Sequence, residues 1–425
     1  MLRNAIDAVV KAYFTALLFL MYFFINEAIF IGGIGITLRH LFALAVIASA
    51  FIYFIVRPDA AAAAVSVKSA LVFAVPLLVV IASSLLVWVI DKSEISTIAR
   101  GLSGCLVYTN WLSCALAAAS VLYVFGENGI WFNLAALLGS NLVMIFNIMR
   151  SDGIGKFIRE LIELLTSFAA NNGETIVKAE IHELAFCLGA YIIYMLCKPR
   201  KKTWFWVLFS LALFCFLAAF KRIAIFAIIA AVILRALMIL PSKISEKALR
   251  KSVNAVMLIC VFLLIAYIAV IKADVFSLLE RAGVDTSGRA YVYSHVNEYY
   301  EFSPLFVGNG IGFLTYQLNE VVSLGVSAVH NDFLQFFIDL GFFGYILWLS
   351  SMTVLRTKYF GRDGDSGTAL ITMLLTVYLL IVSATDNTIN YPLLTTVMGV
   401  IIMGNNYAER VRRQGEQFEV RPFGS

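Results

Sequence analysis

The chain has 425 residues, of which 61% are hydrophobic and 14% are charged, and its mean hydropathy is +0.89. This composition excludes a water-soluble globular domain. The formal net charge of +5 comes mainly from short basic segments, which suit anionic lipid headgroups and give no reason to expect nucleic-acid binding.

Apolar segments of about 20 residues, the length that crosses roughly 30 Å of hydrocarbon, recur along the whole sequence. We predict an all-α polytopic membrane protein in which residues 1–425 form a single membrane domain. The first span is followed by no small-residue cleavage site, so we expect an uncleaved anchor. About twelve transmembrane helices are predicted, near residues 8–25, 40–56, 69–90, 101–125, 129–149, 182–197, 203–220, 223–240, 253–271, 331–352, 368–385 and 389–406.

Lysine and arginine concentrate in residues 198–202, 243–251, 356–362 and 410–413, and such segments usually face the cytoplasm. This bias predicts that both termini are cytoplasmic, with residues 407–425 forming a basic tail. The segments 26–39, 91–100, 150–181 and 272–330 then fall on the outer side.

The outer segment 150–181 begins with apolar residues at helical spacing from Ile154 onward, and charged residues occupy the opposite face. The pattern predicts an amphipathic helix that lies on the outer membrane surface. Two roles stay open for it, a cover for the helix bundle and a lid over a bound substrate.

The outer segment 272–330, between the ninth and tenth predicted helices, is rich in tyrosine and phenylalanine. These rings suit stacking on sugars, although aromatic belts at membrane interfaces have the same composition. The segment ends in His330-Asn331-Asp332, where loop becomes helix, and Gln335 follows one turn later. Histidine titrates near neutrality, so we predict that His330 can accept a proton from a hydroxyl group.

Lys221, Arg222 and Arg289 are cations on the predicted outer side, where the positive-inside bias disfavours them. Lys221 and Arg222 could simply form the turn of a helical hairpin, with side chains that reach water. A guanidinium group, however, matches the oxygens of phosphate. We predict phosphate binding by Arg222 and Arg289, with Lys221 undecided. Two arginines and a histidine together indicate a pyrophosphate leaving group and a base.

Other chemistry finds little support. The six cysteines lie in or beside predicted spans and imply no disulfide framework, and His182-Glu183 lacks the second histidine of a zinc motif. Asp363-Gly364-Asp365 imitates a nucleotide-sugar motif but is expected to be a turn. We therefore expect neither a metal ion nor a cofactor.

Three further features concern the last helices. Asp339 falls inside a predicted span, where we expect a structural partner such as an inward-facing arginine. Gly341 and Gly344 are expected to allow close helix packing. Asp386 and Asn387, in the last outer turn, are candidates to lie near His330.

These motifs together resemble the O-antigen polymerase and O-antigen ligase superfamily of bacterial polysaccharide assembly. The resemblance is carried by Ser287-Gly288-Arg289, Ser303-Pro304-Leu305-Phe306 with Gly308 and Gly310, His330-Asn331-Asp332 with Leu334-Gln335, Gly341 to Gly344, and Lys221-Arg222 at the start of a span. It implies a glycosyltransferase C-like fold in the bacterial inner (plasma) membrane, a metal-independent reaction, and an undecaprenyl-pyrophosphate-linked glycan as donor. It also implies that His330 is the base or positions the acceptor, that Arg222 and Arg289 hold the pyrophosphate, and that Asn331, Asp332 and Gln335 support them.

Within that superfamily, residues 299–304 and 330–335 look closer to polymerases of O-antigen, capsule or exopolysaccharide than to ligases. Our expectation is a polymerase that transfers a growing glycan to a lipid-linked repeat unit. The alternatives are a ligase that transfers the finished glycan to lipid A core, and a flippase or secondary transporter. Carriers place polar residues at the midplane of two related halves, which this sequence does not show. Expected partners are the lipid-linked oligosaccharide, the bilayer, and a flippase and chain-length regulator of the same pathway.

Overall fold

A computed structural model of the chain describes residues 2–25, 27–31, 34–90, 111–166, 182–239, 245–284, 286, 288–318, 329–362, 366–388 and 391–420. Several predictions fall outside these residues: the outer segment 91–100, the part of segment 150–181 after residue 166, Cys105, and the turn Asp363-Gly364-Asp365. Nearly all regular structure in the described part is helical. The exception is an antiparallel hairpin of β1 (Ala28–Ile31) and β2 (Ile34–Thr37), which pairs Ala28 with Thr37 and Ile31 with Ile34.

The chain divides into two compact units. The first unit comprises Met1–Leu71, Ser113–Leu237 and Pro392–Ser425, and the second comprises Val72–Leu112 and Met238–Tyr391. The boundary between them falls inside one long helix, α3 (Ala60–Ile90).

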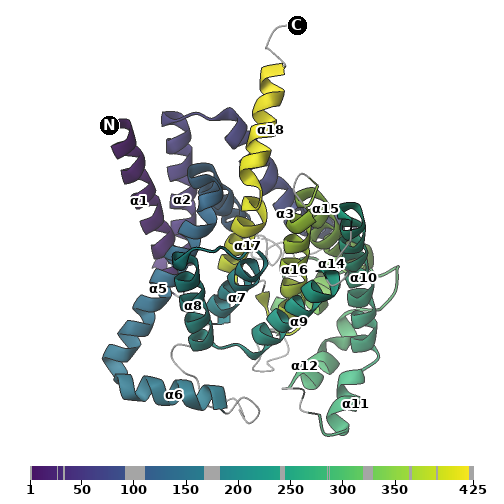
Figure 1. Cartoon of the computed structure of the whole chain (residues 1–425). Helices are drawn as coiled ribbons and strands as arrows, with labels where there is room; N and C mark the ends of the chain where they lie inside the picture. The colour runs from purple at the N-terminus through teal and green to yellow at the C-terminus, as the bar shows by residue number, and fades with distance from the viewer. Residues whose placement is uncertain are drawn as a thin grey trace. The chain divides into compact units, whose positions relative to one another are not determined.

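Within the first unit, α1 packs on α2 and α5, and α7 packs on α8 and α17 (Figure 1). A buried polar chain links three of these helices: the Tyr22 hydroxyl donates to Asn133 Oδ1 at 2.9 Å, and Asn133 Nδ2 donates to the Tyr191 hydroxyl at 2.8 Å. Such bonds hold apolar helices together where hydrocarbon offers no other partner. The helices of this unit are α1 (Leu2–Phe23), α2 (Leu38–Val56), a helix over residues 111–125, η1 (Gly126–Asn128), α5 (Gly129–Asp152), α6 (Ile154–Thr166), α7 (His182–Cys197), α8 (Thr203–Ala219), α9 (Arg222–Ile239), α17 (Pro392–Gly404) and α18 (Tyr407–Val420).

Within the second unit, α10 packs on both α14 and α16. Its core is aromatic: the rings of Phe336 and Trp348 stack at 4.1 Å, and Phe337 meets Tyr345 edge-on at 5.5 Å. The helices of this unit, besides the second part of α3, are α10 (Glu246–Lys272), α11 (Val275–Arg281), α12 (Arg289–Val296), η2 (Asn297–Tyr299), α13 (Phe313–Tyr316), α14 (Asp332–Ser350), the π-helical η4 (Ser351–Leu355), α15 (Arg356–Phe360) and α16 (Ser366–Ser383).

Six helical segments among the described residues are long and apolar enough to cross a membrane: Leu38–Val56, Ala60–Ile90, Trp111–Asp152, Arg222–Ile239, Glu246–Lys272 and Asp332–Phe360. Four shorter apolar helices accompany them: Glu183–Cys197, Thr203–Ala219, Gly367–Ser383 and Pro392–Gly404. The chain is therefore a helical, multi-pass membrane protein, as predicted. The count of twelve spans and the position of the large loop between the ninth and tenth stay predictions.

Helix α14 is broken at Gly341, whose φ of 71° and ψ of −179° are not helical. Segment 306–314 of the preceding loop runs against this break. The Phe342 N–H donates to the Phe306 carbonyl at 2.9 Å, and the N–H groups of Asn309 and Gly310 donate to the carbonyls of Ile338 and Asp339 at 3.1 and 2.8 Å. We call residues 306–314 together with residues 338–342 the clasp.

Glycine is required on both sides of the clasp. A Cβ atom on Gly308 would lie 2.4 Å from the Gly341 nitrogen, and one on Gly341 would lie 2.2 Å from the Val307 carbonyl carbon. Both residues also have positive φ, at 89° and 71°. The prediction that Gly341 allows close packing against another helix is thus wrong, because Gly341 packs against a loop. Gly344, by contrast, does pack against a helix, at Ser83 of α3.

Asp339 sits inside the clasp and is fully buried. Its carboxylate accepts hydrogen bonds from the N–H groups of Gly312 and Leu314, both at 3.3 Å. The expected arginine partner is therefore replaced by loop backbone. A carboxylate can fill this role because it accepts from two donors that otherwise have no partner inside the protein.

Candidate functional site

His330 lies directly before α14 in the second unit, and its side chain is 55% exposed. Its φ of 52° is one that side chains rarely adopt and that costs on the order of 1 kcal/mol. The Nδ1 atom is 3.9 Å from Oδ1 of Asp386, a carboxylate whose side chain is only 4% exposed. The imidazole therefore has one nitrogen facing a buried negative charge, which leaves Nε2 for a ligand.

Asn331 fixes the backbone beside His330. As the N-cap of α14 it accepts, through Oδ1, the N–H groups of Phe333 and Leu334 at 3.1 and 3.2 Å. Its amide nitrogen donates to the hydroxyls of Tyr267 on α10 and Tyr293 on α12, at 3.1 and 3.0 Å. Asn331 is completely buried, and its two donated bonds use both hydrogens of the amide nitrogen. The residue supports the site and does not face a ligand.

Tyr293 is also buried, and burial raises the pKa of its phenol. The hydroxyl therefore stays neutral and keeps its place in the Asn331 contact over a wide pH range. Since Tyr293 lies on α12, this contact fixes the position of α12 with respect to the start of α14.

Asp332 joins the start of α14 to the turn after α16. Its carboxylate accepts from the Thr388 hydroxyl, which also contacts the Ser383 hydroxyl at 2.7 Å. In the same turn, Asp386 Oδ1 accepts the Asn387 N–H at 2.8 Å and the Tyr391 hydroxyl at 3.2 Å. The carboxylate that faces His330 is therefore held in a fixed position.

Arg289, the first residue of α12, is attached to this turn as well. One terminal nitrogen donates to the Thr385 carbonyl at 3.0 Å. Its Nε–H is buried and has no hydrogen-bond partner among the described residues. Arg289 and His330 thus both approach the stretch Thr385-Asp386, one from α12 and the other from α14.

Gln335 lies one helical turn beyond Asn331, and its amide donates to the Thr315 hydroxyl at 3.3 Å. Only 9% of Gln335 is exposed. It connects α14 to the loop that contains α13, so its contact supports the loop.

Lys221 and Arg222 belong to the first unit, between α8 and α9. The chain leaves the helical conformation at Phe220, and the Lys221 carbonyl accepts the N–H groups of Ala224 and Ile225 at 3.0 and 3.3 Å to start α9. The Arg222 side chain is exposed. The contacts above connect His330, Asn331, Asp332 and Arg289 through the start of α14 and the turn after α16, whereas Gln335 contacts the loop that contains α13. The roles of these residues, and phosphate binding by Lys221 and Arg222, stay predictions.

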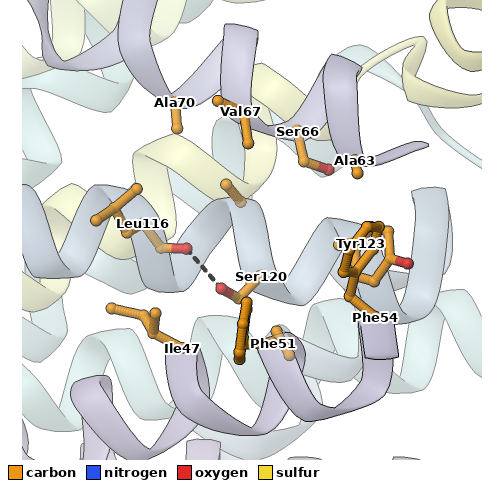
Figure 2. Close-up of a pocket in the computed structure, with 12 residues that line it drawn as sticks. Ile47, Phe51, Phe54, Ala63, Ser66, Val67, Ala70, Leu116, Ser120 and Tyr123 are labelled. Atoms are coloured by element: carbon orange, nitrogen blue, oxygen red, sulfur yellow. Dashed lines mark hydrogen bonds between the residues drawn. The ribbon is translucent and has the colours of Figure 1, made fainter. Parts of the chain in front are cut away.

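A cavity of about 370 Å³ in the first unit lies between α2, α3 and the helix over residues 111–125 (Figure 2). Its walls are almost wholly apolar. The hydroxyls on it are already bonded inside the protein: Ser120 donates to the Leu116 carbonyl at 2.9 Å, Tyr123 to the Arg57 carbonyl at 2.9 Å, and Ser66 contacts the Tyr407 hydroxyl at 2.7 Å. This cavity offers no group for chemistry.

Residues 207–349 match the family model described as O-antigen ligase. The match covers about a third of the chain and includes parts of both compact units. The resemblance to the O-antigen polymerase and ligase superfamily is thereby confirmed, and the matched segment contains Lys221, Arg222, Arg289 and His330. A comparison with curated proteins found no match.

The turn at residues 384–388 lies beyond the matched segment, yet it supplies Asp386. Sequence reasoning named Asp386 only as a residue to test and Tyr293 only as one aromatic residue of the outer segment, and it missed Tyr267, Thr385 and Thr388. Asp386 could be found because a carboxylate next to a predicted outer boundary is unusual. The other four carry no comparable signal.

Among the residues that the structure describes, no group of three or more His, Cys, Asp or Glu side chains could hold a metal ion. The metal-independent reaction stays a prediction. Arg289, which is attached to the same turn as Asp386, carries a guanidinium group, and such a group is chemically suited to phosphate oxygens.

Proposed function

We propose that the protein is a polysaccharide polymerase. It transfers a growing glycan from undecaprenyl pyrophosphate to a lipid-linked repeat unit at the outer face of the bacterial plasma membrane. The observation that carries this proposal is the arrangement of His330, the buried Asp386 carboxylate and Arg289 around one turn, at the end of a membrane-spanning helix within the segment that matches the O-antigen ligase family.

In the proposed reaction, a hydroxyl oxygen of the acceptor sugar attacks the anomeric carbon of the donor glycan. The new glycosidic bond forms as the bond between that carbon and the phosphate oxygen breaks. His330 Nε2 takes the hydroxyl proton, and Asp386, on the Nδ1 side, stabilises the resulting imidazolium. The 3.9 Å separation would shorten as the imidazole becomes charged.

The leaving undecaprenyl pyrophosphate gains negative charge, which needs fixed positive partners. Arg289 supplies one, since its guanidinium group is permanently charged and one of its terminal nitrogens is fixed on the Thr385 carbonyl. Arg222, and Lys221 beside it, are proposed to supply the others. This use of guanidinium groups would take the place of a metal ion.

The ligase reaction is the second candidate, and it is favoured by the description of the matching family as O-antigen ligase. It uses the same donor and the same proton transfer, and differs only in that lipid A core is the acceptor. The polymerase would work in one pathway with a flippase that delivers repeat units and with a regulator of chain length.

Reconstitution separates these reactions. The purified protein is placed in liposomes with undecaprenyl-pyrophosphate-linked repeat units, with or without lipid A core, and products are resolved by gel and mass spectrometry. A polymerase yields a ladder of longer chains without lipid A core, whereas a ligase yields product only with it. Repeat units that cross the bilayer with no new glycosidic bond would overturn both proposals.

Variants test the assignments within this assay. His330→Ala and Arg289→Ala should each lower transfer by a factor of about 100 or more, because each removes a group that acts on the transition state. Arg289→Lys should recover only part of the loss, since a lysine cannot form the paired contacts of a guanidinium group. Leu278→Ala, on the exposed face of α11, is the matched control and should keep wild-type transfer. Unchanged transfer by Arg289→Ala would remove Arg289 from the site.

A further inference from the structure

Helix α12, which begins with Arg289, has two different faces. Ala290, Val292, Tyr293 and Val296 are buried against the second unit. Tyr291 is 53% exposed, Ser294 on the same side is exposed as well, and His295 beside them is half-buried. The exposed face therefore starts beside the cation of the candidate site and continues for about 9 Å along the helix axis, at 1.5 Å per residue.

The exposed side chains are held in place by one another. The rings of Tyr291 and His295 have centroids 4.3 Å apart at an angle of 55°. The Tyr291 carbonyl accepts the Ser294 hydroxyl at 2.8 Å and lies 2.7 Å from His295 Nδ1. A carbonyl only accepts, so Nδ1 carries the proton and Nε2 is left as an acceptor. These contacts give a preformed surface of an aromatic ring with polar groups at its edge.

Packing does not explain this surface, whereas it does explain other aromatic residues of the same loop. Tyr300 is 2% exposed and meets Phe337 edge-on, and Phe306 stacks on Phe337 at 5.7 Å. An aromatic belt at the membrane interface does not explain this surface either, because the aliphatic residues of α12 lie on the opposite, buried face. A residue inserted among lipid chains is expected to have aliphatic neighbours on its own side.

We infer that Tyr291, Ser294 and His295 form a sugar-binding subsite for the glycan next to the pyrophosphate. One sugar ring places its C–H face on the Tyr291 ring, and its hydroxyls bond to the Ser294 hydroxyl and to His295 Nε2. This inference rests on the proposed function, because it is Arg289 that would place the sugar nearest the diphosphate beside α12. The contacts that fix α12, from Tyr293 to Asn331 and from Arg289 to Thr385, fix the direction in which the glycan leaves the site.

The test measures KM and kcat for the lipid-linked repeat unit in the liposome assay. Tyr291→Ala should raise KM about tenfold and leave kcat within about twofold, because the ring binds sugar and takes no part in bond formation. Tyr291→Phe keeps the ring and should resemble wild type. The matched control is Leu278→Ala, which removes an exposed apolar side chain from the neighbouring α11.

Direct binding gives a second readout that does not depend on turnover. In a Tyr291→Trp variant, a soluble oligosaccharide of the repeat unit should change the tryptophan emission in a saturable way, and inorganic pyrophosphate alone should not. An emission change that requires only lipid vesicles, or an equal rise in KM for Leu278→Ala, would identify a membrane contact and overturn the subsite.

The two proposals can fail separately. If wild-type protein joins no repeat units, the polymerase proposal fails, and oligosaccharide binding to the Tyr291→Trp variant still reports on the subsite. If wild-type protein is active but Tyr291→Ala has the wild-type KM and the tryptophan emission does not respond to oligosaccharide, the subsite is wrong and the proposed reaction stands.

Discussion

His330 keeps a backbone conformation that favours glycine, and its neighbour Asn331 holds it there through two backbone and two phenol contacts. Strain of this kind persists only where the surroundings determine the conformation, and it is concentrated at functional sites. We therefore propose that the side chain at position 330 has a functional role and does not serve stability.

Replacing His330 by glycine tests whether the imidazole is kept for function at a cost in stability. His330→Gly should raise the stability of the protein by up to about 1 kcal/mol, because glycine adopts positive φ without strain, and it should abolish glycan transfer. Thermal unfolding in detergent measures the first effect, and the liposome assay measures the second. His330→Ala is the control, since it removes the imidazole and keeps the strain. A glycine variant that is less stable than the alanine variant would show that the backbone strain has no energetic weight.

The sequence supports part of the candidate site at this scale. The sequence draws attention to His330 and Arg289 because each interrupts a local pattern: His330 is a titratable ring where a loop becomes an apolar helix, and Arg289 is a cation on the predicted outer side. Tyr267 and Thr388 could not, because their roles arise from contacts with Asn331 and Asp332, which are distant in the chain. A tyrosine in an apolar run looks like any other core residue.

Among the structural elements, the clasp depends on two glycines whose backbones touch. Gly308→Ala should destabilise the protein by about 2 to 4 kcal/mol, because the added Cβ meets the Gly341 backbone at 2.4 Å and cannot move aside. The decrease in melting temperature in detergent is the measurement.

Gly283 provides the matched control for that substitution. Its φ of 84° is close to the 89° of Gly308, but no atom lies within 4 Å of an added Cβ. Gly283→Ala therefore bears only the conformational penalty, on the order of 1 kcal/mol. Equal losses of stability in the two variants would mean that the close approach at the clasp adds nothing.

Helix α6 is a second element with a testable role. It turns away from the end of α5 at Gly153, which has a φ of 88° (Figure 1). Ile154, Ile158 and Ile162 are between 48% and 57% exposed along one side, while Phe157 is buried. On another side Lys156 pairs with Asp152 and Glu160, at 3.3 and 3.6 Å. An exposed isoleucine row beside a charged face suits a helix that lies in the membrane interface.

A fluorescent probe on α6 should report this contact. With an environment-sensitive dye attached through Ile158→Cys, emission in liposomes should be shifted to the blue, because the dye enters the acyl region. The same dye attached through Glu160→Cys, on the charged side, should emit as it does in water. Identical emission from the two positions would place α6 away from the bilayer.

The sequence predicts helical segments well because apolar runs and turn residues are local signals. It does not predict the break in α14, since Gly341 begins an apolar run that continues to Leu349 and reads as ordinary helix. The break becomes necessary only when the backbone of residues 306–310 is placed against it. The expected arginine partner of Asp339 was wrong for the same reason. The actual partners are backbone N–H groups of a loop, and the sequence of α14 contains no signal for such a contact.

For the whole molecule, the positive-inside bias makes a prediction about the two sides of the membrane. In a variant whose own cysteines are replaced by alanine, Ser294→Cys should react with a membrane-impermeant maleimide added to intact spheroplasts. Gln414→Cys, on α18, should react only after permeabilisation. The reverse pattern would put His330 on the cytoplasmic side and would end the proposal of transfer from an outer lipid-linked donor.

The clasp also sets an order of events during synthesis. Residues 306–314 leave the ribosome before α14 does, yet the carbonyls and the carboxylate that accept four of their N–H groups belong to residues 338 and 339. Peptide groups without hydrogen-bond partners are excluded from hydrocarbon. Residues 306–314 are therefore expected to stay in water until α14 has entered the bilayer. A nascent chain arrested just before α14 would therefore carry nine predicted spans in place and an unseated loop, which an added protease could cut.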